Sequence, residues 1–173
     1  MKTKIKLKVL GVLIAFILCF PLHFIYEKVP NFFISIIAPV NESIFEHMKM
    51  LFTSIILAGV IQKIIVKVKK LDINNVCFSN FVAATLSIPI FLSMFIPIYL
   101  YIGENLPITI FIMLLAIIMA EYISYLIMNM KDLKMENITI IFTIIVYLIF
   151  GILTYNPPIN ELFRDPITNS YSI

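Results

Sequence analysis

The sequence predicts an all-α, polytopic helical membrane protein with about five transmembrane helices and one short re-entrant or interfacial segment. Of its 173 residues, 61% are hydrophobic and only 13% are charged, and its mean hydropathy is +1.03. A soluble domain is about 45–50% apolar and about 25% charged. The apolar runs are continuous rather than alternating, which favours helices over a β-barrel because lipid leaves no partner for unpaired backbone groups.

Five apolar runs have about the length that a membrane-crossing helix needs, roughly 17–25 residues. They lie near residues 9–26, 47–66, 81–102, 108–128 and 138–154. We therefore expect residues 1–154 to form a single transmembrane domain, followed by a tail at residues 155–173.

The first run follows a lysine-rich start, as in a secretory signal peptide. No small-x-small cleavage site follows it, so we expect an uncleaved first span. His23 lies near the far end of this span. An imidazole there is either simply hydrogen-bonded or available as a metal ligand and proton carrier.

Basic residues gather at alternate junctions of the five spans, which predicts the orientation. One side receives Lys2, Lys4, Lys6, Lys8, Lys63, Lys67, Lys69, Lys70, Lys131 and Lys134. The other side receives Lys28, Lys49 and Arg164. We therefore expect a multi-pass protein of the cell (cytoplasmic) membrane, with a cytoplasmic N-terminus and an extracytoplasmic C-terminus. The net charge of +3 reflects this topology, and no basic patch interleaved with aromatic residues supports nucleic-acid binding.

Residues 31–46 form the expected interfacial or re-entrant segment. Its apolar part, 31–39, is too short to cross a bilayer. After Pro39 a helix can begin with Asn41 or Ser43 as its cap, and Ser43 with Glu46 fits a capping box. Since the following apolar run is short, this helix is expected to continue into the second span and to draw its polar first turns toward the hydrocarbon.

Those first turns hold the densest polar cluster of the chain, Pro39-Val40-Asn41-Glu42-Ser43-Ile44-Phe45-Glu46-His47-Met48-Lys49. At 100° per residue, Glu42, Glu46 and Lys49 are expected to share one helical face, with Ser43 and His47 beside them. Such carboxylates can bind a divalent metal, exchange a proton, or merely neutralise the lysine. Glu42, Glu46 and His47 are therefore the candidate catalytic residues, and with His23 the candidate metal ligands. An interfacial helix with internal ion pairs is the structural alternative.

Glu121 is a second anomaly, because it lies inside the fourth span. A carboxylate there has to be protonated, hydrogen-bonded to a neighbour such as Tyr122 or Tyr125, or exposed to a polar cavity. We expect either a structural hydrogen bond or a role in the outer site or in a proton path. Ala116, Ala120 and Ser124 recur every four residues beside it, which predicts close helix packing.

The tail after the fifth span is rich in turn residues, with prolines at 157, 158 and 166. Asn41 and Asp165 can offer oxygen ligands, Arg164 can bind a carboxylate or an anionic lipid headgroup, and Lys49 belongs to the polar cluster itself. Together with His23 and Glu121, these four are the candidate binding residues. A docked tail would cover the polar cluster, whereas a disordered tail would leave it open.

The Pro39-Val40-Asn41-Glu42-Ser43 and Glu46-His47-x-Lys49 motifs, with Phe163-x-Asp165-Pro166-x-Thr168 in the tail, resemble a family of small bacterial polytopic membrane proteins known as a domain of unknown function. The resemblance covers the whole chain and implies a membrane protein, but no activity. The tail departs from the family pattern by ending Asn169-Ser170-Tyr171-Ser172-Ile173, where glycines are expected.

Several functions fit these residues, while no nucleotide loop, zinc-protease motif, nucleophile elbow or CxxC pair is present. The main interpretation is an outward-facing acidic and histidine site that binds a cation or a lipid headgroup. One alternative is a membrane-embedded hydrolase or transferase, metal-dependent or acid–base, that acts on a lipid-linked substrate. The others are a small transporter component, with Glu121 as a cation or proton station, and a non-catalytic subunit that docks on another membrane protein. Besides the lipid bilayer, another membrane protein is thus the partner to expect.

Overall fold

A computed structural model describes residues 2–103 and 105–171. Within these residues the chain forms six helices and no strands. Their order is α1 (Lys2–Lys28), α2 (Phe32–Ile37), α3 (Ile44–Val68), α4 (Val76–Ile102), α5 (Leu106–Met128) and α6 (Glu136–Tyr155). Five of the six are long and apolar enough to cross a membrane. The expected all-helical membrane fold is therefore confirmed, with α2 as the short additional segment.

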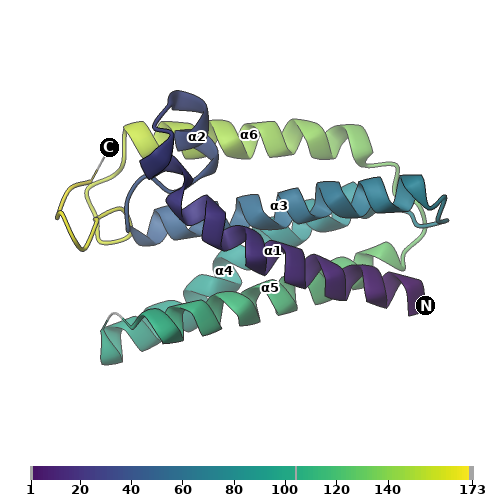
Figure 1. Ribbon diagram of the computed structural model, residues 1–173, viewed down its shortest axis with the longest axis horizontal. Coiled ribbons are helices and arrows are strands. Elements are labelled where there is room, and N and C mark those ends of the chain that lie inside the picture. The colour runs from purple at the N-terminus through teal and green to yellow at the C-terminus, as the bar shows by residue number, and fades with distance from the viewer. Residues whose placement is uncertain (1, 104, 172–173) are drawn as a thin grey trace.

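The five long helices run side by side, and α1 crosses obliquely in front of α3 and α5 (Figure 1). Helix α6 lies along the other side of α3, with α2 packed against its end (Figure 1). One end of the bundle holds the C-terminal ends of α1, α4 and α6, together with the short α2 and the C-terminal tail (Figure 1). We call this the tail end, and the opposite end, which holds the N-terminus, the N-terminal end.

Helix α3 is the central element, because it has the largest buried share among the candidate spans. Its buried residues include Leu51, Phe52 and Ile55, which are fully enclosed. Phe52 packs edge-on against Tyr147 and Phe150 of α6. Many apolar side chains of the other long helices are exposed, as expected for a surface that faces lipid tails.

The segment between α1 and α3 turns back at the tail end and never crosses the bundle. Asn31 caps α2 by accepting a hydrogen bond from the Ile34 N–H, and Ala38 ends that helix in extended geometry. Ser43 then caps α3, with its Oγ accepting from the Glu46 N–H at 3.4 Å. Only this half of the predicted capping box forms, because a Glu46 carboxylate oxygen accepts from the Val40 N–H instead.

Candidate functional site

Three side chains from separate parts of the chain meet at the tail end. His23 comes from the last turns of α1, Glu42 from the segment before α3, and His47 from the first turn of α3. The Nε2 atoms of His23 and His47 lie 3.4 Å and 3.7 Å from the same Glu42 oxygen, Oε2. One donor atom from each residue lies within 4.8 Å of the other two. We call these three residues the His–Glu–His group.

The cap of α3 positions two members of this group. The Asn41 side chain accepts a hydrogen bond from the Ser43 N–H at 3.0 Å, which fixes the turn that carries Glu42. His47 lies one turn into the helix, and its Nδ1 is 3.0 Å from the Ser43 carbonyl oxygen. Since a carbonyl can only accept, this Nδ1 carries a proton and the ring presents Nε2 to Glu42.

The proton on Nδ1 of His47 leaves its Nε2 as an acceptor that faces the Glu42 carboxylate. With its proton on Nδ1, a neutral imidazole faces the carboxylate with the lone pair of Nε2. Two acceptors at 3.7 Å repel each other unless a cation, either a proton or a metal ion, lies between them. The hydrogen bond from His23, together with the positive charge of either imidazole when it is protonated, lowers the pKa of Glu42 below its ordinary value of 4.5, although partial burial opposes the shift. This carboxylate is therefore an anion that attracts a cation.

The geometry of the group suits a zinc-type ion. Zinc binds imidazole nitrogen and carboxylate oxygen at about 2.0–2.2 Å, so neighbouring ligands of a tetrahedral ion lie about 3.3–3.6 Å apart. The separations of 3.4 and 3.7 Å between Glu42 and the two imidazoles are close to that spacing. Among the described residues, the buried Nδ1 of His23 has no hydrogen-bond partner, so this ring lacks the second hydrogen bond that orients His47.

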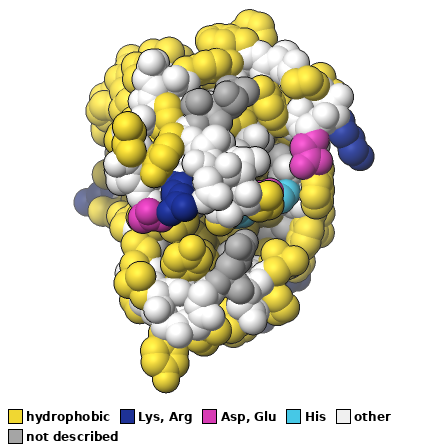
Figure 2. Space-filling view, turned by 90° about the vertical axis from the view of Figure 1, so that its left-hand side faces the viewer, with side chains coloured by type: hydrophobic (Ala, Val, Ile, Leu, Met, Phe, Trp, Pro, Cys, Tyr) yellow, Lys and Arg dark blue, Asp and Glu magenta, His cyan; other side chains and the backbone are white. Residues whose placement is uncertain are grey.

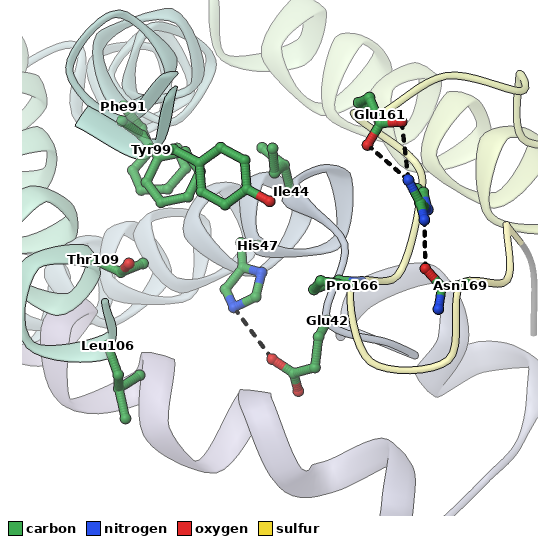
Figure 3. A pocket seen from close by; sticks show the side chains of 12 residues that line it. Glu42, Ile44, His47, Phe91, Tyr99, Leu106, Thr109, Glu161, Pro166 and Asn169 are labelled. Carbon is green, nitrogen blue, oxygen red and sulfur yellow. Dashed lines mark hydrogen bonds and ion pairs between the residues drawn. The ribbon is translucent and has the colours of Figure 1, made fainter. Parts of the chain in front are cut away.

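The group lies between two pockets. One has a volume of about 240 Å³ and is bordered by Glu42, His47 and the tail, as Figure 3 shows. The other has a volume of about 390 Å³ and is lined mainly by apolar side chains of α1 and α5. At the tail end of the molecule, a histidine side chain is visible in a hollow between charged residues (Figure 2). The group is thus partly accessible, which the exposed fractions of 24%, 31% and 18% for the side chains of His23, Glu42 and His47 support.

Glu46 and Lys49 lie apart from this group and form a buried ion pair of 2.5 Å. The Lys49 ammonium donates to the Ser35 carbonyl at 2.6 Å and to the Thr154 hydroxyl at 2.9 Å. The pair thereby joins α3 to α2 and α6. The expectation that Glu42, Glu46 and Lys49 share one helical face is wrong, because α3 begins at Ile44 and Glu42 precedes it in non-helical backbone.

Glu121 belongs to the N-terminal end and is remote from the His–Glu–His group. It is buried and pairs with Lys8 of α1 at 2.9 Å, rather than with Tyr122 or Tyr125. The Lys8 ammonium also contacts Gln62 at 2.9 Å and Asn80 at 3.1 Å. Along α1, Lys8 and His23 are on the order of 20 Å apart at about 1.5 Å per residue. Glu121 is therefore not part of the outer site.

The tail docks at the tail end, with Phe163 buried and stacked on Phe45 of α3. Asp165 is also buried, and it organises the tail turn by accepting hydrogen bonds from the Ile167 N–H at 2.9 Å and the Thr168 hydroxyl at 2.7 Å.

Arg164 lines the pocket under the tail and donates hydrogen bonds to Glu161 and Asn169 (Figure 3). Of the two predicted binding residues of the tail, Arg164 lines the pocket beside the His–Glu–His group and Asp165 does not.

Sequence reasoning missed two kinds of residue. Leu106 and Thr109 of α5 line both pockets beside the group, and nothing in their local sequence marks them. The sequence pattern places Lys8 among the basic residues that flank the first span, yet α1 begins at Lys2 and Lys8 is buried. Its place nearest the apolar run is the only signal that sets it apart from Lys2, Lys4 and Lys6.

Comparison with known proteins gives the chain a family. No curated protein and no solved structure matches it. The model of a family of unknown function (DUF6512) matches residues 1–173, the whole chain. This match agrees with the resemblance found from the motifs, and with five candidate membrane spans the chain is a multi-pass membrane protein. The protein therefore belongs to the DUF6512 family of unknown function.

Proposed function

We propose that this membrane protein binds one divalent metal ion through His23, Glu42 and His47, with zinc as the ion that fits best. The observation that carries the proposal is the approach of two imidazole nitrogens to one carboxylate oxygen, at 3.4 and 3.7 Å. Two nitrogens and one oxygen are donors that zinc accepts readily. Calcium and magnesium prefer sets made of oxygen alone, so they fit this group less well.

Metal-dependent hydrolysis is the activity that such a site would support. Three protein ligands leave a fourth position of a tetrahedral ion for water or substrate, as in catalytic rather than structural zinc sites. When bound, the metal would activate that water and polarise the bond to be cleaved. The pockets on both sides of the group support this reading, because a structural site has no need of adjoining space for a substrate.

The test is metal binding by the protein purified in detergent. After chelation and buffer exchange, the parent protein should bind one zinc ion per chain. Elemental mass spectrometry gives the zinc content, and isothermal titration calorimetry gives the affinity. His47→Ala and Glu42→Gln should each weaken zinc binding by more than about 100-fold, because losing a ligand costs more than losing an outer-shell partner, which costs about 10- to 100-fold. Zinc affinity should also fall at acidic pH, because protons compete for the imidazoles.

Asp72→Asn is the matched control, since Asp72 is an exposed carboxylate in the turn between α3 and α4, at the opposite end of the bundle from His23. It should bind zinc as the parent does. Equal zinc affinity in the parent, His47→Ala and Glu42→Gln proteins would disprove the proposed site, provided that all three elute from gel filtration as folded protein.

A further inference from the structure

The two pockets beside the His–Glu–His group differ in chemistry and meet at the group itself. Glu42 and His47 border both of them, as do Leu106 and Thr109 of α5. A molecule that extended through both pockets would therefore pass directly over the proposed metal ligands.

The larger pocket is an apolar groove between α1 and α5. Besides the shared residues and His23, it is lined by Phe16, Cys19, Phe20, Phe24, Met50, Ile110 and Met113. Phe16 and Phe24 are eight residues apart, so the groove follows α1 for about 12 Å. Phe20 and Phe24 are 47% and 50% exposed, and both belong to a candidate membrane span. The groove thus opens sideways, where a lipid tail would be the neighbouring molecule.

The smaller pocket lies under the docked tail, and it combines apolar side chains of α3 and α4 with charged and polar side chains of the tail. Arg164 lines it and is held by Glu161 and Asn169, all three of which come from the tail (Figure 3). The Arg164–Glu161 ion pair is exposed, with side-chain exposures of 40% and 80%, so it is weak and Arg164 can exchange partners. A guanidinium binds phosphate or carboxylate through parallel hydrogen bonds. A divalent ion held by His23, Glu42 and His47 would add positive charge at the border of this pocket.

We propose that the site takes a membrane amphiphile with an anionic, phosphate-type headgroup. Its chain lies in the groove between α1 and α5, its headgroup enters the pocket under the tail near Arg164, and the bond between the two lies over the His–Glu–His group. This inference rests on the proposed metal site and names the substrate class for it. The sideways opening of the groove lets the lipid enter from the bilayer without passing through water.

The chain contains no tryptophan, so a single introduced tryptophan reports on its own surroundings without background. Ile110→Trp places the reporter in the groove. Phe111→Trp, the next residue of α5, is the control, because Phe111 is 59% exposed and lines neither pocket. Both zinc-loaded variants are placed in phosphatidylcholine nanodiscs that contain increasing amounts of phosphatidylglycerol with brominated chains, which quenches nearby tryptophan.

The expected result is quenching of Ile110→Trp that saturates at a low fraction of brominated phosphatidylglycerol and is reversed by the unlabelled lipid. Phe111→Trp should be quenched only in proportion to the brominated fraction. Glycerophosphoglycerol, the same phosphodiester without acyl chains, should compete at least about 100-fold more weakly if the groove contributes to binding. Competition by glycerophosphoglycerol at the same concentration as the lipid would instead identify a site for free phosphate compounds and overturn the amphiphile proposal.

Arg164→Gln in the Ile110→Trp background should weaken phosphatidylglycerol binding about tenfold and leave zinc uptake unchanged. Lys28→Gln, which removes an exposed charge at the same end, should change neither. If zinc binds but the two tryptophan reporters are quenched alike, the amphiphile inference fails and the metal site stands. If zinc does not bind, the proposed function itself fails, whichever way the lipid titration turns out.

Discussion

At the level of single residues, the first turns of α3 send neighbouring polar side chains to opposite sides of the helix. His47 points toward α1 and contacts Glu42, whereas Glu46 and Lys49 point toward α2 and α6. The first set is partly exposed beside pockets, and the second is fully enclosed and hydrogen-bonded. Two roles, a candidate metal site and an internal ion pair, therefore lie within one turn of sequence.

Lys49→Met should destabilise the protein strongly, because it leaves the Glu46 carboxylate buried without its partner. Loss of one member of a buried pair costs about 3–5 kcal/mol of unfolding free energy. The measurement is thermal or denaturant unfolding in detergent, with Lys28→Met as the exposed control.

The double variant Glu46→Gln/Lys49→Met should recover much of that loss, because no unpaired charge then remains in the interior. It should also keep its zinc uptake, since neither residue belongs to the His–Glu–His group. A single Lys49→Met variant as stable as the parent would contradict the structural role assigned to the pair.

The Glu42 carboxylate should make the folded protein less stable as the pH falls. Its pKa is lowered in the folded protein below 4.5, chiefly by the hydrogen bond from His23. A carboxylate with a lowered pKa stabilises the fold above its ordinary pKa, and this contribution is lost as the pH falls through the lowered value. In metal-free protein, the difference in melting temperature between the parent and Glu42→Gln should therefore shrink as the pH falls from about 5 to below 4.5. A difference in melting temperature that grows on acidification would contradict the lowered pKa of Glu42.

At the level of elements, small residues decide how closely the long helices pack. Ala116, Ala120 and Ser124 of α5 are fully buried, as their spacing predicted. Where α3 meets α4, a Cβ added to Gly59 would lie 2.6 Å from the Cβ of Asn80. No side chain fits there unless the two helices move apart.

Gly59→Ala should therefore destabilise the bundle by about 1–3 kcal/mol through overpacking, despite the better helix propensity of alanine. Gly151→Ala in α6 is the matched control, because its Cβ would meet only the flexible Ile36 side chain, at 3.3 Å. Unfolding in detergent compares the two variants, and equal stability would contradict the close contact between α3 and α4.

At the level of the whole molecule, the polar interior is divided between the two ends of the bundle. Lys8 and Glu121, with Gln62 and Asn80, join α1, α3, α4 and α5 at the N-terminal end. The His–Glu–His group and the docked tail occupy the other end. The distribution of lysines predicts that the N-terminal end faces the cytoplasm and the tail end faces outward.

Cysteine labelling tests this orientation, after the native cysteines are replaced by Cys19→Ala and Cys77→Ser. An impermeant maleimide should label Ile159→Cys in intact cells, because Ile159 is an exposed residue of the tail. Asp132→Cys, between α5 and α6, should react only after permeabilisation. The reverse pattern would place the candidate metal site on the cytoplasmic side.

Composition, run length and capping residues are local properties, so they predict the all-helical membrane class, a short segment before α3 that does not cross the membrane, and the polar cluster around Glu42 and His47. That the short segment contains the helix α2 is known from the structure. Only the tertiary structure decided which of these polar residues meet. His23 is far from Glu42 in sequence and reaches it because α1 crosses α3. Lys8 forms its ion pair with Glu121 for a similar reason, since α1 also packs against α5. Helical periodicity orders residues along one helix, but contacts between helices depend on crossing geometry, which no local pattern encodes.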